Sequence, residues 1–189
     1  WTAEDGVGVI TLNRPAYRNA QGYRMLDEID QAFDLARANH EVRVVVVRGA
    51  GGVFSTGHDL GTPEGIAYRK ALGAQPGIQT YDQFKKYNLD LLLKWRNFEK
   101  PTIAMVNGWC FGGAFQVLLG CDLALADEDA TFGLSEINWG IIPAGIVTKS
   151  VAMALAQRNP IYSIIPANPC DPNPACDAGR VVSRVRTPR

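Results

Sequence analysis

The apolar positions of the first fifty residues follow two different periods. A β-branched run at residues 7–12 predicts a buried strand, which ends before Pro15 because proline lacks a backbone donor and fixes its own φ. From residue 24 to about 38 the apolar positions recur every three or four residues and predict an amphipathic helix. A second β-branched run follows at residues 42–47. Because such a continuous run is typical of a strand covered on both faces, the three segments predict a β-α-β unit with a parallel sheet.

The strand-then-helix rhythm continues in the next part of the chain and indicates an α/β fold. Residues 60–79 combine many glycines and prolines and predict a loop or a lid. Helical spacing returns over residues 81–96, and Pro101 opens a third strand. Shorter segments are expected in the order strand, glycine-rich turn, helix and strand, at 102–106, 107–113, 114–119 and 123–126.

Composition narrows the class of protein. Of the 189 residues, 47% are hydrophobic and 20% are charged, which suffices for one sizeable core in a single domain. Acidic and basic residues number 19 each, so the chain lacks the basic surface that nucleic-acid or anionic-membrane binding usually needs. No apolar run reaches the roughly 20 residues that span a bilayer. We therefore expect a small-molecule partner, no nucleic acid and no membrane.

The cysteines and histidines do not follow a metal-binding pattern. Only two histidines, His40 and His58, are present, and the cysteines lack short paired spacings, so no metal site is predicted. Reduced thiols in a cytoplasmic protein are the simpler interpretation of the four cysteines, Cys110, Cys121, Cys170 and Cys176.

The ends of the sequence differ from those of a complete domain. Trp1 stands where an initiator methionine would be, and residues 166–189 are rich in proline and arginine. Such a composition does not favour regular packed structure. We expect an incomplete core over residues 1–165, an irregular tail over 166–189, and a chain that is truncated at its C-terminus.

Two glycine-containing motifs suggest chemistry that their spacing does not support. The GAGG run at residues 49–52 follows a strand, but the third glycine of a dinucleotide fingerprint would fall at Phe54. The GLSEI run at residues 133–137 fails the serine-hydrolase motif at its last position. A nicotinamide enzyme and a serine hydrolase are therefore disfavoured.

Two other glycine turns are candidates for an oxyanion hole. Gly112 and Gly113 lie between a strand and a helix, and Gly57 precedes His58 in a second turn. Exposed backbone N–H groups in such turns can stabilise a developing anion, as on a thioester enolate, and each donor is typically worth about 3 kcal/mol. The alternative for each turn is close packing of a helix on a strand.

Glu136 is the candidate proton-transfer group. Its apolar sequence neighbours would raise the pKa of its carboxyl, although an ordinary surface or capping carboxylate fits the local pattern as well. His58 is expected to act through its backbone N–H rather than as a base, and Asp59 and Asp122 to be hydrogen-bonding groups at turns or strand ends. Three tryptophans either line a substrate pocket or fill the core: Trp95, Trp109 and Trp139.

Four segments together resemble the crotonase, or enoyl-CoA hydratase/isomerase, superfamily. They are ITLNRPAYRNA (10–20), FSTGHDL (54–60), KPTIAMVNGWCFGGAF (100–115) and CDLALADEDATFGLSEINWGI (121–141). Within the superfamily, NGWCFGG and ATFGLSEINWGI most resemble the hydroxycinnamoyl-CoA (feruloyl-CoA) hydratase/lyases. The stretch FSTGHDL is more similar to general enoyl-CoA hydratases.

The resemblance implies a fold, a site and a substrate class. The fold would be a spiral of β-β-α units, with an oxyanion hole made by the N–H groups of His58 and Gly113 and with Glu136 as the acid/base. CoA would enter as part of an acyl-CoA substrate, with no separate cofactor. The family assembles through C-terminal helices, so a homotrimer or hexamer is expected. Positions that match CoA or acyl contacts are Tyr17, Thr56, Leu60, Ser135 and Trp139.

The sequence departs from its apparent family at Gln116. Hydratases with two glutamates carry a second carboxylate there, and hydroxycinnamoyl-CoA hydratase/lyases carry a serine. Glutamine can orient a water molecule but cannot take its proton at neutral pH. The resemblance therefore favours a lyase that adds water to an enoyl-CoA or hydroxycinnamoyl-CoA through Glu136 alone. The alternatives are an enoyl-CoA isomerase and a non-catalytic acyl-CoA-binding protein.

Overall fold

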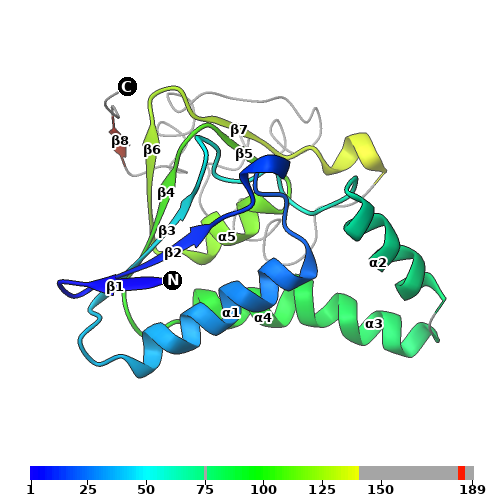
Figure 1. The fold of residues 1–189 in the computed structure, drawn as a ribbon, viewed down its shortest axis with the longest axis horizontal. Coiled ribbons are helices and arrows are strands. Elements are labelled where there is room, and N and C mark those ends of the chain that lie inside the picture. Colours follow the sequence, from blue (N-terminus) through cyan, green and yellow to red (C-terminus); the bar gives the residue numbers. More distant parts are fainter. Residues whose placement is uncertain (75, 141–182, 186–189) are drawn as a thin grey trace, which may run out of the picture.

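The computed structural model describes residues 1–74, 76–140 and 183–185, and shows a mixed α/β fold (Figure 1). Within these ranges one sheet has six strands in the order β1-β2-β3-β4-β6-β8, and β5 pairs with β7 in a second sheet. The strands are β1 (Thr2–Glu4), β2 (Val7–Leu12), β3 (Val44–Gly49), β4 (Thr102–Val106), β5 (Trp109–Phe111), β6 (Leu123–Asp127), β7 (Thr131–Gly133) and β8 (Ser183–Val185).

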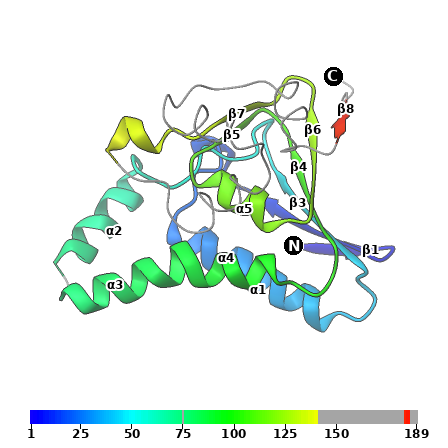
Figure 2. The same cartoon turned by 180° about the vertical axis from the view of Figure 1, so that it is seen from behind.

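The helical elements lie between these strands, singly or in succession. The α-helices are α1 (Tyr23–Ala38), α2 (Pro63–Gly73), α3 (Gly77–Lys85), α4 (Leu91–Arg96) and α5 (Ala114–Gly120). A π-helical turn, Lys86–Asp90, joins α3 to α4, and two 3₁₀ turns cover Pro15–Tyr17 and Glu136–Trp139. Figures 1 and 2 show α1 and α4 running side by side below the sheet.

The predicted β-α-β unit is confirmed. Strand β2 is parallel to β3, with Val7 opposite Val44, and α1 connects them. The apolar face of α1 is buried in the core, where the rings of Phe33 and Trp95 stack with centroids 5.7 Å apart. In the valine run of β3, buried residues alternate with partly buried ones, so one face of the strand is fully covered and the other is covered in part. Trp95 is buried, so for this tryptophan the core alternative holds rather than the pocket alternative.

The expected loop over residues 60–79 is wrong, because α2 and the start of α3 occupy most of it. Helix α2 has a clear start signal: the Thr62 side chain accepts a hydrogen bond from the Gly65 N–H, and Pro63 occupies the first helical position. Its end coincides with Gly73. The glycines and prolines of this segment therefore mark helix ends, and both helices extend away from the sheet (Figure 1).

The boundary expected at residue 165 lies outside the described residues, as do Cys170 and Cys176. Residues 183–185 differ from the irregular structure expected there, because they form β8 and pair in parallel with β6, with Leu125 opposite Ser183. In the described ranges, none of the helices has the length and apolar character needed to cross a membrane.

Candidate active site

The two glycine turns singled out in the sequence lie next to each other because the chain after β3 pairs with β5. The Phe54 N–H donates to the Asn107 carbonyl at 2.6 Å, and the Ser55 N–H donates to the Trp109 carbonyl at 2.9 Å. The Phe111 N–H donates back to the Ser55 carbonyl at 3.1 Å. Because residues 54–55 pair in parallel with β5, the turn after residue 55 lies beside the turn after β5.

The contact between these turns leaves no room for a side chain at Gly57. Its φ is +86°, and a Cβ atom there would lie 2.7 Å from the backbone nitrogen of Gly113. A Cβ atom on Gly113 would in turn meet the imidazole of His58 at 2.9 Å. Within the described part of the chain, the N–H groups of His58 and Gly113 donate no hydrogen bond. The two turns thus lie in contact, and an oxyanion hole needs two N–H groups in such proximity.

Glu136 reaches this place through the pairing of β7 with β5. Phe111 lies opposite Gly133, and the Gly112 N–H donates to the Gly133 carbonyl at 2.9 Å. The 3₁₀ turn that begins at Glu136 follows directly, and a Cβ atom on Gly112 would lie 3.8 Å from Glu136 Oε1. The carboxylate thus lies over the second glycine turn.

The electrostatics of Glu136 suit a proton-transfer group. Burial raises the pKa of its carboxyl above the ordinary value, and a backbone hydrogen bond only partly offsets that effect. Its Oε2 atom is buried and has no hydrogen-bond partner among the described residues.

Burial lowers the pKa of the His58 imidazole, against a weaker opposite effect of the Asn88 side chain, so this imidazole is neutral near pH 7. A neutral side chain agrees with the expected role of the His58 backbone.

Most of the predicted site residues surround one cavity of about 660 Å³, and Glu136 and His58 also border a second of about 150 Å³. Gln116, which is 4% exposed, lines the smaller cavity. The backbone of Trp139 lies in the 3₁₀ turn, but its side chain falls outside the described residues. Trp109 is 40% exposed and lies in neither wall. The predicted residues that line the larger cavity are Tyr17, Thr56, His58, Leu60, Gly113, Ser135 and Glu136.

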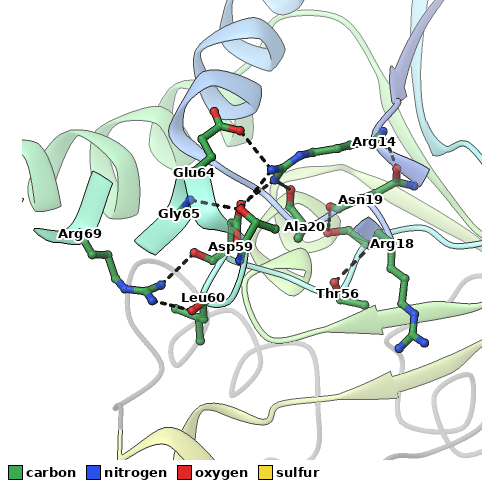
Figure 3. A network of polar contacts seen from close by, with 12 residues as sticks. Arg14, Arg18, Asn19, Ala20, Thr56, Asp59, Leu60, Glu64, Gly65 and Arg69 are labelled. Atoms are coloured by element: carbon green, nitrogen blue, oxygen red, sulfur yellow. Dashed lines mark hydrogen bonds and ion pairs between the residues drawn. The ribbon is translucent and has the colours of Figure 1, made fainter. Parts of the chain in front are cut away.

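Arg14, which sequence analysis missed, fixes the turn that carries His58. Its guanidinium donates to the Asp59 carboxylate at 2.6 Å and to the Ala20 carbonyl at 3.1 Å (Figure 3). Asp59 Oδ1 also accepts from the Thr62 N–H at 3.0 Å. The expected hydrogen-bonding role of Asp59 is thus confirmed, as is that of Asp122, which accepts from the Thr102 N–H and hydroxyl.

We expect Asp59→Asn to lower the free energy of unfolding by about 2 kcal/mol, because it removes the charge of a buried carboxylate from a partly buried ion pair. Burial alone would raise the pKa of Asp59, but the hydrogen bonds from Thr62 and Arg14 outweigh it and hold the pKa below its usual value. A lowered pKa in the folded state means that the stabilisation is complete above the unfolded-state pKa of about 3.9 and is lost as pH falls through the folded-state pKa.

Urea unfolding of wild type and variant near pH 7 and at about pH 3 checks this prediction. The difference between the two proteins should shrink at the lower pH. An undiminished difference at acid pH would contradict the assignment of the charge on Asp59 as the source of the stabilisation.

A mostly parallel sheet, two adjoining glycine turns and a partly buried glutamate are the features expected of an α/β protein of the crotonase type. The family model for enoyl-CoA hydratase/isomerase matches residues 2–187, and the chain belongs to this family. The expected family and fold class are thereby confirmed.

Individual relatives agree with this membership. The chain is 38% identical over 181 residues to the hydroxycinnamoyl-CoA hydratase-lyase of Pseudomonas fluorescens, covering 94% of this chain and 63% of the relative. It is 36% identical over 138 residues to the enoyl-CoA hydratase EchA19 of Mycobacterium tuberculosis, covering 72% and 49%. The chain thus spans about half to two thirds of the length of these relatives.

Solved structures show the same fold. The enoyl-CoA hydratase/isomerase from Xanthobacter autotrophicus Py2 has a TM-score of 0.83 to this chain at 33% identity, covering 98% of this chain and 65% of that structure. The enoyl-CoA hydratase from Polaromonas sp. JS666 has a TM-score of 0.86 at 27% identity, covering 98% and 69%.

Proposed function

We propose that this chain is a CoA-thioester lyase that adds water to an enoyl-CoA or hydroxycinnamoyl-CoA. The observation that carries the proposal is that His58, Gly113 and the partly buried Glu136 line one cavity. Two N–H donors suit the oxygen of a thioester enolate, and a carboxyl with a raised pKa suits the proton transfer that accompanies enolate formation.

The larger cavity is the proposed site of the CoA portion. Its wall includes Tyr17, Thr56 and Ser135, which the family resemblance relates to CoA or acyl contacts. Arg18 also lines it, with its guanidinium 4.6 Å from the centre of the Trp109 ring, and sequence analysis missed this residue. A cation at this wall suits the phosphates of CoA, because guanidinium groups form paired hydrogen bonds to phosphate oxygens.

The proposed reaction needs only one carboxylate. Glu136 takes a proton from water as the water oxygen bonds to C3 of the enoyl group, and the C2–C3 double-bond electrons move onto the thioester oxygen. The N–H groups of His58 and Gly113 bind this enolate oxygen. Glu136 then returns the proton to C2, so that one water molecule has added across the double bond. Gln116 orients the water through its side-chain amide.

The raised pKa of Glu136 predicts the acid side of the pH–rate profile. Because the free enzyme needs Glu136 as a carboxylate, kcat/KM for hydration should fall as pH decreases through an apparent pKa above the ordinary value of 4.5. Initial hydration rates at a series of acidic pH values measure this decrease in kcat/KM. A kcat/KM that stays constant to below the ordinary carboxyl pKa would contradict the role assigned to Glu136.

Turnover of crotonyl-CoA compared with feruloyl-CoA tests the proposed function. Hydration of either substrate supports it, and release of an aromatic aldehyde with acetyl-CoA from the second substrate shows that cleavage follows hydration. If the protein binds acyl-CoA but consumes neither substrate, the proposed function is contradicted. The expected trimer or hexamer and the cytoplasmic location belong to the same proposal, and light scattering measures the assembly.

A non-catalytic acyl-CoA-binding protein is the second candidate, and the amide of Gln116 favours it because this side chain cannot act as a base at neutral pH. Calorimetry with CoA thioesters separates the two candidates. Binding without turnover of any enoyl or aromatic thioester would favour the second.

A further inference from the structure

The buried polar atoms without a partner lie around the smaller cavity. In the described part of the chain, the side-chain atoms that are buried without a hydrogen bond are Gln21 Nε2, Gln21 Oε1, His58 Nε2 and Glu136 Oε2. All three residues line the cavity of about 150 Å³. Leaving buried polar groups unpaired is costly, so their gathering on one cavity indicates that a ligand pairs with them.

Of these three residues, Gln21 is the one that has no role in the proposed reaction, since His58 contributes its backbone N–H and Glu136 its carboxylate. The residue is 3% exposed, and its backbone is fixed beside the His58 turn: the Gln21 N–H donates to the Gly57 carbonyl at 2.7 Å, and the Asp59 N–H donates to the Gln21 carbonyl at 3.0 Å. Its side chain has a donor and an acceptor, and both lack partners. The amide is therefore held at the cavity wall with its hydrogen-bonding capacity intact.

Two other polar side chains of this wall, those of Asn88 and Tyr87, already have partners. Asn88 donates to the Phe84 carbonyl at 3.0 Å, and the Tyr87 hydroxyl donates to Asp27 Oδ2 at 2.9 Å. This contrast makes Gln21 the stronger candidate for direct contact with a bound group.

The position of the smaller cavity indicates which part of a substrate enters it. The two cavities share His58, Leu60 and Glu136, so a thioester carbonyl held by the His58 N–H lies where they meet. The larger cavity then takes the CoA portion and the smaller one the acyl group. A cavity of about 150 Å³ holds a group about as large as benzene, so it suits a short acyl group.

We propose that Gln21 is a specificity-determining residue that recognises a hydroxyl, or another group able to donate and accept a hydrogen bond, on a short acyl chain. The proposal rests on the proposed function and deepens it by naming the substrate class as short hydroxylated enoyl-CoA thioesters. A hydroxyl satisfies both the oxygen and the nitrogen of the amide, whereas a methyl group leaves both unpaired.

Paired substrates test this assignment. Wild type should show a kcat/KM for 4-hydroxycrotonyl-CoA at least about tenfold above that for crotonyl-CoA, because a site built to bond a hydroxyl discriminates against the analogue that lacks it. Gln21→Leu should remove the preference, mainly by improving use of crotonyl-CoA. Gln31→Leu is the matched control, since Gln31 is an exposed residue of α1, and it should keep the wild-type preference.

The outcomes separate this proposal from the proposed function. Equal use of both substrates by wild type would overturn the role of Gln21 and leave the hydratase intact. If neither is turned over, the proposed function fails, and calorimetry with butyryl-CoA and 4-hydroxybutyryl-CoA decides the role of Gln21. Tighter binding of the hydroxylated ligand by wild type, lost in Gln21→Leu, supports recognition, and equal affinities refute it. The wild-type comparison holds even where Gln21→Leu fails to fold.

Discussion

Glu136→Gln is expected to lower kcat/KM for hydration of an enoyl-CoA by about a thousandfold, in the range typical for removal of a general acid/base. The amide keeps the size and most of the hydrogen-bonding geometry of the carboxylate but cannot take a proton from water. Because the carboxylate is partly buried and has no ion-pair partner among the described residues, the neutral replacement should not destabilise the fold. The decrease in absorbance of the enoyl thioester measures the rate, and thermal unfolding measures the stability.

The matched control for this variant is Glu99→Gln. Glu99 is an exposed glutamate that forms an ion pair with Arg37 at 3.0 Å, and it lines neither cavity. Its replacement should leave kcat/KM at the wild-type value. Full activity in Glu136→Gln would show that another group moves the proton and would refute the single-carboxylate mechanism.

Gly113→Ala is expected to lower kcat/KM by about 100-fold or more, comparable to the loss of one oxyanion-hole donor. The added methyl group would lie 2.9 to 3.0 Å from three atoms of the His58 imidazole, so the ring and the turn that carries it must move. Such a movement separates the two N–H donors. Steady-state kinetics with the same enoyl-CoA measures the effect.

A double-mutant cycle identifies the cause of this loss. His58→Ala keeps the backbone N–H and removes the ring that obstructs the methyl group, so Gly113→Ala should cost much less in a His58→Ala background. If the two losses simply add, the clash with the ring is not the cause. If His58→Ala alone lowers activity as much as Glu136→Gln, the imidazole itself acts in the reaction and the backbone role is wrong.

The local patterns predicted the parts of the fold that depend on short-range order. The β-branched run before Pro15 and the amphipathic spacing of α1 gave β2 and α1 with bounds that agree to within a residue. The glycines and prolines at 60–79 predict turns, but Thr62 and Pro63 form the start of a helix. The structure identifies the cap by the hydrogen bond that the Gly65 N–H donates to the Thr62 hydroxyl.

The candidate site was predicted from motifs, but its supporting contacts were not. Glu136, His58 and Gly113 stand in segments with recognisable family patterns, and the structure places them around one cavity. Arg14 and Gln21 act through partners 45 and 36 residues away in the chain, Asp59 and Gly57. Contacts between residues so far apart leave no periodic pattern in the local sequence. The sequence around Arg14 and Gln21 therefore does not indicate that these side chains lie at the site.

The exchange of hydrogen for deuterium at C2 of butyryl-CoA in D₂O tests the central claim most directly, because it reports enolate formation independently of hydration, isomerisation or cleavage. Removal of the C2 proton by Glu136, with the enolate oxygen held by the His58 and Gly113 N–H groups, predicts that wild type incorporates deuterium and that Glu136→Gln does not. Bound butyryl-CoA that gains no deuterium in the presence of wild type would contradict the claim.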